Sequence, residues 1–254
     1  MDPEARHGHK SRARTFDGYK AHLAIDPDDE LITNVTVTPA NSPDRDVVDD
    51  LLAEPVTPSG DGAAVSAEPV TVFGDSAYAD GATLDKLAEA GHEVFAKVPP
   101  VRNSKGYSKD EFRIDPDAGT VGCPAGHTAP IRIRRSGGGG QARFAPWCTS
   151  CPLRAACTTS RSGRMITIHP HEARLQQAKA AQRDPDWQQT YRATRPTVER
   201  KIAHFTRRLR GGRQARCRGE ARILTDAFTR AGAVNLANLA VRGLHFTPTG
   251  WAIA

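Results

Sequence analysis

An α/β architecture is the fold class that the sequence predicts. Three observations predict it: two segments of alternating or β-branched residues near the amino terminus, short apolar strands separated by helical segments after them, and long amphipathic helices toward the carboxyl end. The expected order over the first hundred residues is strand, strand, helix, strand, helix, strand. We therefore expect helices layered on a sheet.

The first two strands form a predicted hairpin. Residues Tyr19–Ile25 alternate apolar and polar side chains, as a half-buried strand does. Residues Leu31–Val37 are rich in β-branched side chains, which favour strands. The polar segment Pro27–Glu30 separates them, so we expect the two strands to pair antiparallel through a short loop.

A short helix is expected over residues 43–54. Asn41 can cap it, Pro43 suits its first position, and apolar residues such as Val48 and Leu51 recur at helical spacing. The elements predicted after it are a Pro/Gly-rich loop, a strand, a helix and a strand, at residues 55–68, 70–73, 83–90 and 94–98.

The second half changes character twice. Residues 99–167 are rich in Gly and Pro and contain four of the five cysteines, so we expect an insert too Gly-rich to bury much of a core. Helices are then predicted at residues 171–183, 187–209 and 219–242. The predicted domains are a core, the insert, a helical part and a tail, at residues 1–98, 99–167, 168–246 and 247–254.

Composition narrows the class of protein. The chain has 254 residues, of which 38% are hydrophobic, so it can bury a real core and is not globally disordered. No stretch approaches the ~20 uninterrupted apolar residues of a membrane helix, and the first 14 residues lack the apolar core of a signal peptide. We expect a soluble cytoplasmic protein without a membrane partner.

Charge is distributed unevenly. Residues 26–93 contain 16 acidic and only two basic residues, whereas residues 191–230 contain 12 basic and three acidic ones. A basic segment of this kind indicates a nucleic-acid partner, although a solvated basic surface is the alternative. The candidate DNA-binding residues are Arg200, Lys201, Arg207, Arg208, Arg210, Arg213, Arg216 and Arg218.

The cysteines suggest a metal site. An odd number of cysteines without a signal peptide argues against a disulfide framework. Cys148 and Cys151 form a Cys-x2-Cys pair, and Cys123 and Cys157 flank it. Four thiolates, or three with His127, would make a structural zinc site, and unligated reduced thiols are the alternative. Cys217 stands apart between two arginines.

Two carboxylates are candidates for chemistry. Asp75 follows a predicted strand at its carboxyl end, where α/β proteins place ligands, although it could simply start a turn. Glu199 borders the apolar face that we expect from Val198, Ile202, Phe205 and Leu209. It could reach a metal ion held by Asp75, or it could pair with Arg195 one helical turn away. Pro196 either starts or kinks this helix.

Six motifs follow one another along the chain. They are Asp17-Gly-Tyr-Lys-Ala-His22, Val35-Thr-Val-Thr-Pro-Ala-Asn41, Gly74-Asp-Ser-Ala-Tyr78, the insert motifs Cys-Pro-x-Gly-His and Cys-x2-Cys-Pro-Leu-Arg-x2-Cys, and Tyr-Arg-x2-Arg-Pro-x-Val-Glu-Arg. In this order they resemble the DDE transposases of bacterial insertion sequences, in the group with a cysteine-bearing insert before the catalytic glutamate. The resemblance extends from Asp2 to Leu244.

This resemblance implies a ribonuclease-H-like fold, in which a mixed sheet carries three acidic residues that gather two magnesium or manganese ions. It assigns the second aspartate to Asp75 and the glutamate to Glu199, with Tyr191 and Arg195 assisting at the DNA end. The lysine usual after the glutamate is replaced here by Thr206-Arg207-Arg208. The implied reaction is two-metal phosphoryl transfer, which cleaves and joins double-stranded DNA at the ends of the element.

The first aspartate of the implied triad has no good candidate. Only two strands are predicted before the helix at Pro43, so we expect strand one of this fold, with its aspartate, to lie upstream of Met1. Asp2 lies at the terminus, which we expect to be frayed, and Asp17 lies in the motif leading into strand two. We therefore expect a catalytic-domain fragment whose activity is open and which could act as a homodimer. The alternatives are a non-catalytic, zinc-stabilised DNA-binding remnant and a ribonuclease-H-like nuclease.

Overall fold

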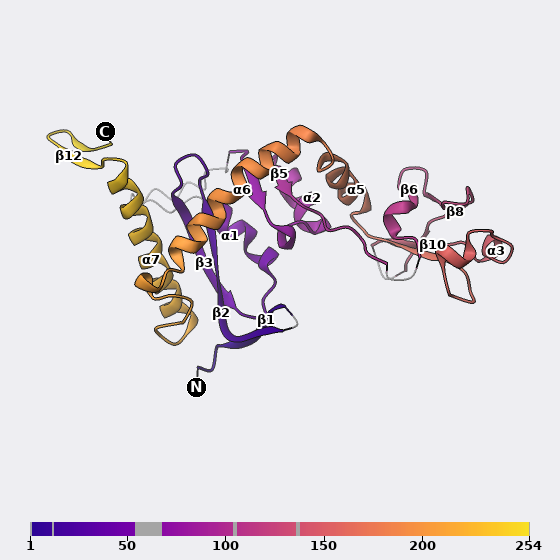
Figure 1. Cartoon of the computed structure of the whole chain (residues 1–254), viewed down its shortest axis with the longest axis horizontal. Coiled ribbons are helices and arrows are strands. Elements are labelled where there is room, and N and C mark those ends of the chain that lie inside the picture. Colours follow the sequence, from indigo (N-terminus) through magenta and orange to yellow (C-terminus); the bar gives the residue numbers. More distant parts are fainter. Residues whose placement is uncertain (1, 12, 54–67, 104–105, 136–137, 254) are drawn as a thin grey trace. The chain divides into compact units, whose positions relative to one another are not determined.

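Residues 2–11, 13–53, 68–103, 106–135 and 138–253 are described by the computed structural model (Figure 1). The chain groups into two units by its internal contacts. Unit 1 consists of Met1–Pro69 and Gln188–Ala254, and unit 2 of Val70–Trp187. The domain boundaries predicted at residues 98, 167 and 246 stay predictions, since this grouping divides the chain elsewhere.

Unit 1 contains a three-stranded antiparallel sheet. Its strands β1 (Arg6–Ser11), β2 (Arg14–Ile25) and β3 (Ile32–Pro39) lie in the order β1-β2-β3. Leu23 pairs with Val35 across β2 and β3, which confirms the predicted hairpin. Within β3 the apolar residues Ile32, Val35 and Val37 are buried and form part of the core.

The strand count before the first helix differs from the prediction. We expected two strands, and the structure has three, because β1 pairs with the first residues of β2, from Arg6 opposite Gly18 to Ser11 opposite Arg14. The polar sequence of β1, Arg-His-Gly-His-Lys-Ser, gave no apolar signal that would have predicted a strand. The expectation that the aspartate-bearing first strand lies upstream of Met1 stays a prediction, since β1 contains no Asp or Glu.

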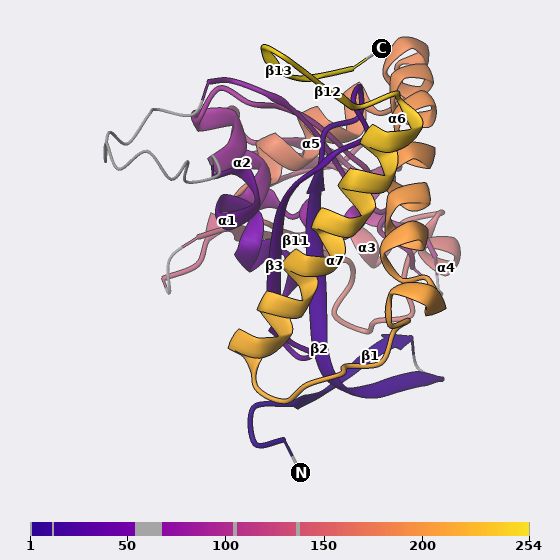
Figure 2. The same ribbon diagram turned by 90° about the vertical axis from the view of Figure 1, so that its left-hand side faces the viewer.

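Helix α7 (Glu220–Val241) covers the sheet of unit 1. It lies along β3 in Figures 1 and 2, and the core between them consists of buried apolar residues from β3, α6 and α7. These residues are Ile32, Val35, Val37, Phe205, Ala227, Ala231 and Val234. Phe228 on the same helix is half exposed. The helix predicted at residues 219–242 is confirmed.

A short helical segment follows the sheet. The 3-10 turn η1 (Asp44–Val47) leads into α1 (Val48–Leu52), and Val47 and Val48 are buried. The helix predicted at residues 43–54 is therefore present, but its first turn is 3-10. Residue 54 and nearly all of the predicted loop at 55–68 lie outside the described residues.

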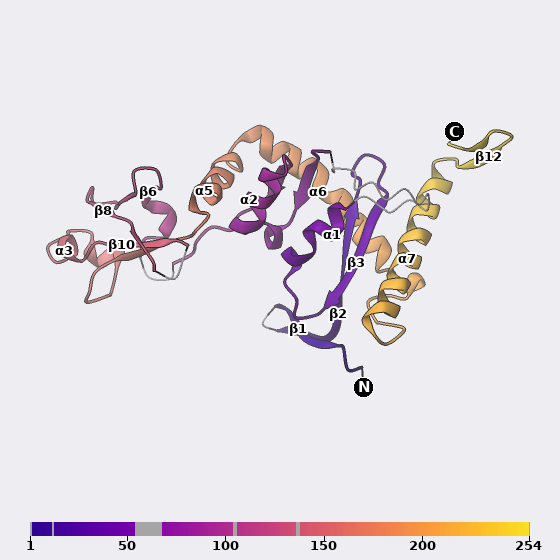
Figure 3. The same ribbon diagram turned by 180° about the vertical axis from the view of Figure 1, so that it is seen from behind.

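Unit 2 contains a parallel strand pair. Strand β4 (Thr71–Gly74) pairs with β5 (Glu93–Ala96), and helix α2 (Gly81–Glu89) connects them. Helix α5 (Glu172–Ala181) packs on α2 (Figure 3), where Leu175 and Ala178 contact the core of Leu84, Ala96 and Val98. The strands and helices predicted for this part are confirmed, with shifts of one or two residues at most ends.

The single mixed sheet that the resemblance implies stays a prediction. The described strands form five sheets of two or three strands each, with β4 and β5 in a sheet of their own. The structure therefore confirms a mixed α/β fold but not the finer sheet order.

The cysteine-bearing insert has its own core, contrary to the prediction. Val121, Ala129 and Ala142 are completely buried, and Phe144 is 1% exposed. Two small antiparallel sheets frame this core: β6 (Arg113–Asp115), β7 (Thr120–Gly122) and β8 (Thr128–Pro130), and β9 (Arg132–Ile133), β10 (Gly140–Arg143) and β11 (Met165–Ile168). Three short helical segments join them: η3 (Lys109–Glu111), α3 (Ala145–Cys148) and α4 (Arg154–Cys157). Glycines such as Gly119 and Gly126 lie at chain reversals with positive φ, outside the strands that supply this core, so they do not prevent apolar residues from packing.

The remaining elements complete the chain. Helix α6 (Pro185–Phe205) continues through Pro196, which therefore does not start it, and ends four residues earlier than predicted. A 3-10 turn η4 (Arg208–Arg210) follows, so Leu209 is not part of the helix face and is 92% exposed. The predicted tail forms a hairpin of β12 (His245–Thr247) and β13 (Gly250–Ala252). Among the described residues, no helix has the length and apolar character needed to span a membrane.

Candidate functional site

Asp75 lies directly after β4, at the carboxyl end of the parallel pair. Its side chain is exposed, and its Oδ1 accepts a hydrogen bond of 2.8 Å from the backbone N–H of Ala77, so it caps the 3-10 turn η2 (Ser76–Tyr78). Gly74 before it is buried, and a Cβ there would lie 3.1 Å from Cβ of Tyr78. The Gly-Asp-x-Ala-Tyr motif thus forms a tight turn directly after β4, and this turn leaves the carboxylate of Asp75 at the surface.

Glu199 projects from α6 into solvent. Its side chain is 69% exposed, and its Oε1 lies 3.6 Å from Nη2 of Arg195, one helical turn earlier. An exposed pair of this kind stabilises a helix by only about 0.3–0.5 kcal/mol. The carboxylate can therefore exchange Arg195 for another ligand at little cost.

Tyr191 and Arg195 occupy successive turns of the same helix. Tyr191 is 9% exposed, and 22% of the Arg195 side chain is exposed, whereas Glu199 is mostly exposed. Because residues four apart share a helix face, these three side chains lie in one row that runs from the interior to the surface. This row places a phenol, a guanidinium and a carboxylate side by side on one element.

The two candidate carboxylates belong to different units, Asp75 to unit 2 and Glu199 to unit 1. Over the described ranges, the structure contains no group of three or more His, Cys, Asp or Glu arranged to hold a metal ion as it stands.

The two other aspartates named at the amino terminus have structural partners. Asp2 accepts hydrogen bonds from the backbone N–H of Gly219 and from the hydroxyl of Tyr19, both at 3.0 Å. Asp17 lies 2.8 Å from Nδ1 of His7, and 80% of its side chain is exposed. Asp2 is thus fixed against the start of α7 rather than frayed, and its hydrogen bond from Gly219 lowers its pKa.

Two of the candidate DNA-binding residues are engaged with a carboxylate of the same unit. Lys201 is 2% exposed, and its Nζ lies 3.0 Å from Oε2 of Glu30; Arg200 also pairs with Glu30. The hydrogen bond from Arg200, followed by that from Lys201, lowers the pKa of Glu30. Lys201 therefore anchors α6 to the turn between β2 and β3 and offers no charge at the surface.

The arginines after α6 lie in a turn-rich segment. Arg207, Arg208 and Arg213 are exposed and have no ion-pair partner in the part of the chain that the structure describes. Arg216 pairs with Asp226, whose other oxygen lies 2.6 Å from Arg230. Of the predicted set, Arg207, Arg208, Arg213 and also Arg218, which is likewise exposed and has no ion-pair partner among the described residues, thus present the least compensated charge.

Two interactions hold this segment in place. Nη1 of Arg210 donates to the carbonyl of His204 at 3.3 Å, and Nη1 of the buried Arg230 donates to the carbonyl of Gly212 at 2.8 Å. Burial, and then the nearby charge of Arg207, lowers the pKa of His204, so the histidine adds little charge at neutral pH.

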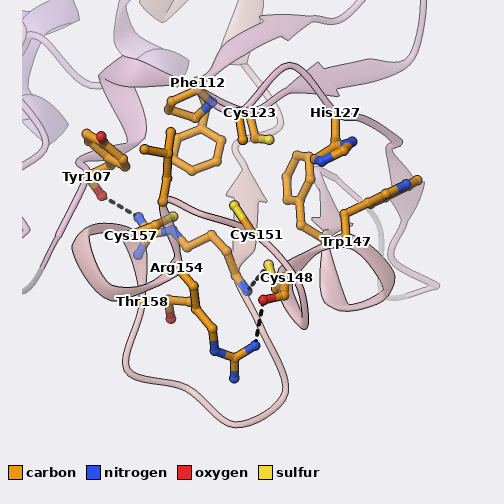
Figure 4. Close-up of a pocket in the computed structure, with 15 residues that line it drawn as sticks. Tyr107, Phe112, Cys123, His127, Trp147, Cys148, Cys151, Arg154, Cys157 and Thr158 are labelled. Atoms are coloured by element: carbon orange, nitrogen blue, oxygen red, sulfur yellow. Dashed lines mark hydrogen bonds between the residues drawn. The ribbon is translucent and has the colours of Figure 1, made fainter.

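The four cysteines of the insert border one pocket. Cys123, Cys148, Cys151 and Cys157 line it together with aromatic and basic side chains, and Figure 4 shows their side chains around a common space. All four are free thiols, as is Cys217 outside the insert. Burial raises the pKa of Cys157, the charge of Arg164 opposes this effect, and the other three thiols raise that pKa further. His127 lines the same pocket, with its ring stacked on Trp147 at 5.8 Å between centroids.

Sequence reasoning missed two residues of these sites, Glu30 and Arg164. Glu30 has a positive φ of 54° in the turn before β3 and holds two basic residues of α6, a long-range contact that leaves no local pattern. Arg164 borders the cysteine pocket just before β11. The recurrence of arginine near the cysteines was the only available signal for it.

Comparison with known proteins gives one family. Residues 122–240, just under half of the chain, match the family model described as Transposase DDE domain. The matched segment contains the cysteines from Cys123 to Cys157 and the row from Tyr191 to Glu199, and it does not include Asp75. No curated protein and no solved structure gives a significant match.

Proposed function

We propose that this chain, a DDE-type transposase by the match over residues 122–240, cleaves double-stranded DNA and transfers strands at the ends of an insertion sequence. The observation that carries the proposal is that the matched segment contains the row Tyr191, Arg195 and Glu199 on α6. A carboxylate supported by a guanidinium on one helix suits chemistry on a phosphodiester, because it combines a metal ligand with a phosphate-binding group.

Asp75 and Glu199 are the residues that would hold divalent cations. Both are exposed carboxylates, and carboxylate oxygens are the donors that Mg²⁺ and Mn²⁺ prefer. A pair of such ions, when bound, activates the attacking water or DNA 3′ hydroxyl and stabilises the leaving oxygen. In this proposal Glu199 exchanges its weak contact with Arg195 for the cation.

Arg195 and Tyr191 position the DNA end. Once Glu199 turns to the cation, the guanidinium of Arg195 can donate two parallel hydrogen bonds to a phosphate. Tyr191 is the almost buried end of this row, and its packing holds the turn of α6 that precedes Arg195. Both are expected to affect how the DNA end is held.

DNA outside the reacting bond is held by the exposed arginines after α6. Arg207, Arg208 and Arg213 are flexible, strongly charged side chains that suit phosphate contacts without base readout. Two copies of the chain would act together, one at each end of the element. Zinc in the cysteine pocket would serve the fold of the insert rather than the reaction.

A second candidate is a non-catalytic DNA-binding protein. The observation that favours it is that both candidate carboxylates have protein partners, Ala77 for Asp75 and Arg195 for Glu199. In this case the arginines would bind element ends, and no strand would be cut.

The test is Mg²⁺-dependent nicking of a supercoiled plasmid by the full chain. We expect Asp75→Asn and Glu199→Gln each to reduce the rate by at least ~100-fold, since each removes a ligand of ions worth several kcal/mol to the transition state. The matched control is Asp117→Asn, which changes an exposed carboxylate of the insert and is expected to leave nicking unchanged.

The outcomes separate the two candidates. Nicking that survives both substitutions contradicts the proposed site. Salt-sensitive DNA binding without nicking by the unmodified chain, in Mg²⁺ or Mn²⁺, favours the non-catalytic candidate.

A further inference from the structure

The cysteine pocket is assembled from separate segments of the insert. Cys123 follows β7, Cys148 ends α3, Cys151 lies in the link to α4, and Cys157 ends α4. Figure 4 shows the sulfur of Cys151 among those of the other three in this view. Two backbone hydrogen bonds close the turn at Cys123, since its N–H donates to the carbonyl of His127 at 2.8 Å and its carbonyl accepts from Gly126 at 2.9 Å. The fold thus brings together four thiols that are up to 34 positions apart in the sequence.

The charges around the pocket are unbalanced if the thiols are neutral. Two arginines, Arg154 and Arg164, line it, and no Asp or Glu does. Nη2 of Arg164 donates to the carbonyl of Tyr107 at 2.8 Å, and its guanidinium lies over the ring of Phe112 at 5.4 Å. Its Nε is buried and has no hydrogen-bond partner among the described residues. A buried cationic donor without an anion nearby is costly, so the pocket lacks a negative charge that the arginines would match.

One thiol already accepts a hydrogen bond suited to a thiolate. The backbone N–H of Arg164 donates to Sγ of Cys148 at 3.4 Å, and the dashed line in Figure 4 marks this bond. N–H groups that donate to sulfur stabilise its charged form more than its neutral form. Arg164 therefore faces the cysteines with its main chain as well as its side chain.

We propose that Cys123, Cys148, Cys151 and Cys157 bind one Zn²⁺ as thiolates, and that Arg164 partly neutralises the resulting centre. Four thiolates on one Zn²⁺ carry two net negative charges, which the guanidinium of Arg164 offsets in part, whereas the guanidinium of Arg154 donates to the carbonyls of Cys148 and Ser160. Four sulfur donors are a set that selects zinc over the hard cations proposed for the carboxylates.

His127 is not needed as a ligand. Its ring is stacked on Trp147, and the four thiols complete a tetrahedral set without it. Because the thiols do not stand in a metal-binding arrangement in this structure, the ion would draw their segments together. It would thereby fix the loops around the core of Phe112, Phe144 and Ile166.

The first measurement uses the full chain as purified without chelator. We expect close to one zinc per chain by elemental analysis and, after exchange with Co²⁺, the near-ultraviolet charge-transfer absorption of cobalt bound to several thiolates. Less than ~0.2 zinc per chain, together with no such absorption after Co²⁺ is added to reduced protein, overturns the proposal. This measurement involves no DNA, so its outcome is independent of the proposed transposase activity.

Variants then test the ligand set. Cys151→Ser is expected to lose the cobalt absorption, whereas the matched control Cys217→Ser retains it, because Cys217 lies outside the insert. His127→Ala is also expected to retain it, and its loss would show that the histidine replaces a thiol. If Cys151→Ser fails to fold, the unmodified chain can be used instead. Removing its zinc with a chelator should then increase the number of thiols that react with a thiol reagent.

The role of Arg164 is tested by the affinity of the chain for zinc, which would not change if the arginine only supported the fold. We expect Arg164→Gln to weaken zinc by about 10–100-fold in competition with a chelator, the usual effect of losing an outer partner of a metal ligand. Arg161→Gln changes an exposed neighbour and should leave the affinity unchanged. Equal affinities in both variants would overturn the role of Arg164 while leaving the four ligands in place.

Discussion

Asp2 shows how a single terminal residue joins distant parts of unit 1. It accepts hydrogen bonds from Gly219 at the start of α7 and from Tyr19 on β2, and Glu4 accepts one from Glu220 at 2.6 Å. Two carboxylates thus lie at the amino terminus of a long helix, where the helix dipole favours negative charge. Because the pKa of Asp2 is lowered, its stabilising effect is present above its unfolded value near 3.8 and is lost as the pH falls through the folded value.

The same contact predicts an unusual tyrosine titration. Burial, and then the hydrogen bond to Asp2, raises the pKa of Tyr19 to about 12. Its contribution to stability is therefore present below the unfolded value of 10 and is lost as the pH rises toward 12. Absorbance at the tyrosinate band should show one late component among the four tyrosines, and Tyr19→Phe should remove it. A late component that persists in this variant would contradict the assignment.

At the scale of elements, one side chain fixes α7 on the sheet. Oδ1 of Asn235 accepts from the N–H of Ile32 at 2.8 Å, and its Nδ2 donates to the carbonyl of the same residue at 2.8 Å. The amide thus pairs with β3 as another strand would. This pairing sets the position of the helix along β3, which apolar packing alone would leave adjustable.

Asn235→Ala should therefore destabilise unit 1. We expect a loss of about 2 kcal/mol or more in the free energy of unfolding, because two partly buried backbone groups lose their partner. Asn238→Ala is the matched control on the same helix, since Asn238 donates to the exposed carbonyl of Asp29 and should cost less than about 1 kcal/mol. Urea unfolding measures both, and equal costs would refute the role of Asn235.

Elements with a clear apolar period were predictable, and those without one were not. The repeat in α7 and the β-branched run in β3 specify their buried faces locally. Strand β1 is polar and has no such period. It is a strand because its backbone pairs with the first residues of β2, and this pairing leaves no apolar pattern in its sequence. The core of the insert is also invisible to a local pattern, since strands of two to four residues contribute one or two buried side chains each.

The residues of the candidate site were likewise predictable only in part. The motifs identified Asp75, Glu199 and the four cysteines by residue type and spacing. They could not show that Lys201 is buried on Glu30 or that the N–H of Arg164 donates to Cys148, because these contacts join residues 171 and 16 positions apart. Residue type thus indicates the chemistry, and only tertiary contacts show which charges remain available for a partner.

At the scale of the whole molecule, the basic segment is partly neutralised from within. Arg200 and Lys201 are paired with Glu30, and Arg216 is paired with Asp226. The net charge counted over this segment is therefore larger than the positive charge that is free to contact DNA phosphates. Of the predicted DNA-binding set, Arg207, Arg208, Arg213 and Arg218 remain exposed without an ion-pair partner among the described residues. DNA binding should therefore depend on these few arginines rather than on the full set of basic residues.

The dependence of DNA affinity on salt tests this distribution. In the double variant Arg207→Gln and Arg208→Gln, we expect the slope of log affinity against log salt to decrease by about 2, since each arginine that contacts a phosphate contributes about one released counterion. Leu209→Ala changes the exposed residue next to Arg208 without changing charge, so its slope should equal that of the unmodified chain. Fluorescence anisotropy with a duplex of arbitrary sequence suffices, because phosphate contacts do not read bases. If the double variant keeps the full slope, the DNA contacts lie elsewhere, and if the unmodified chain fails to bind even at low salt, DNA is not the partner of this segment.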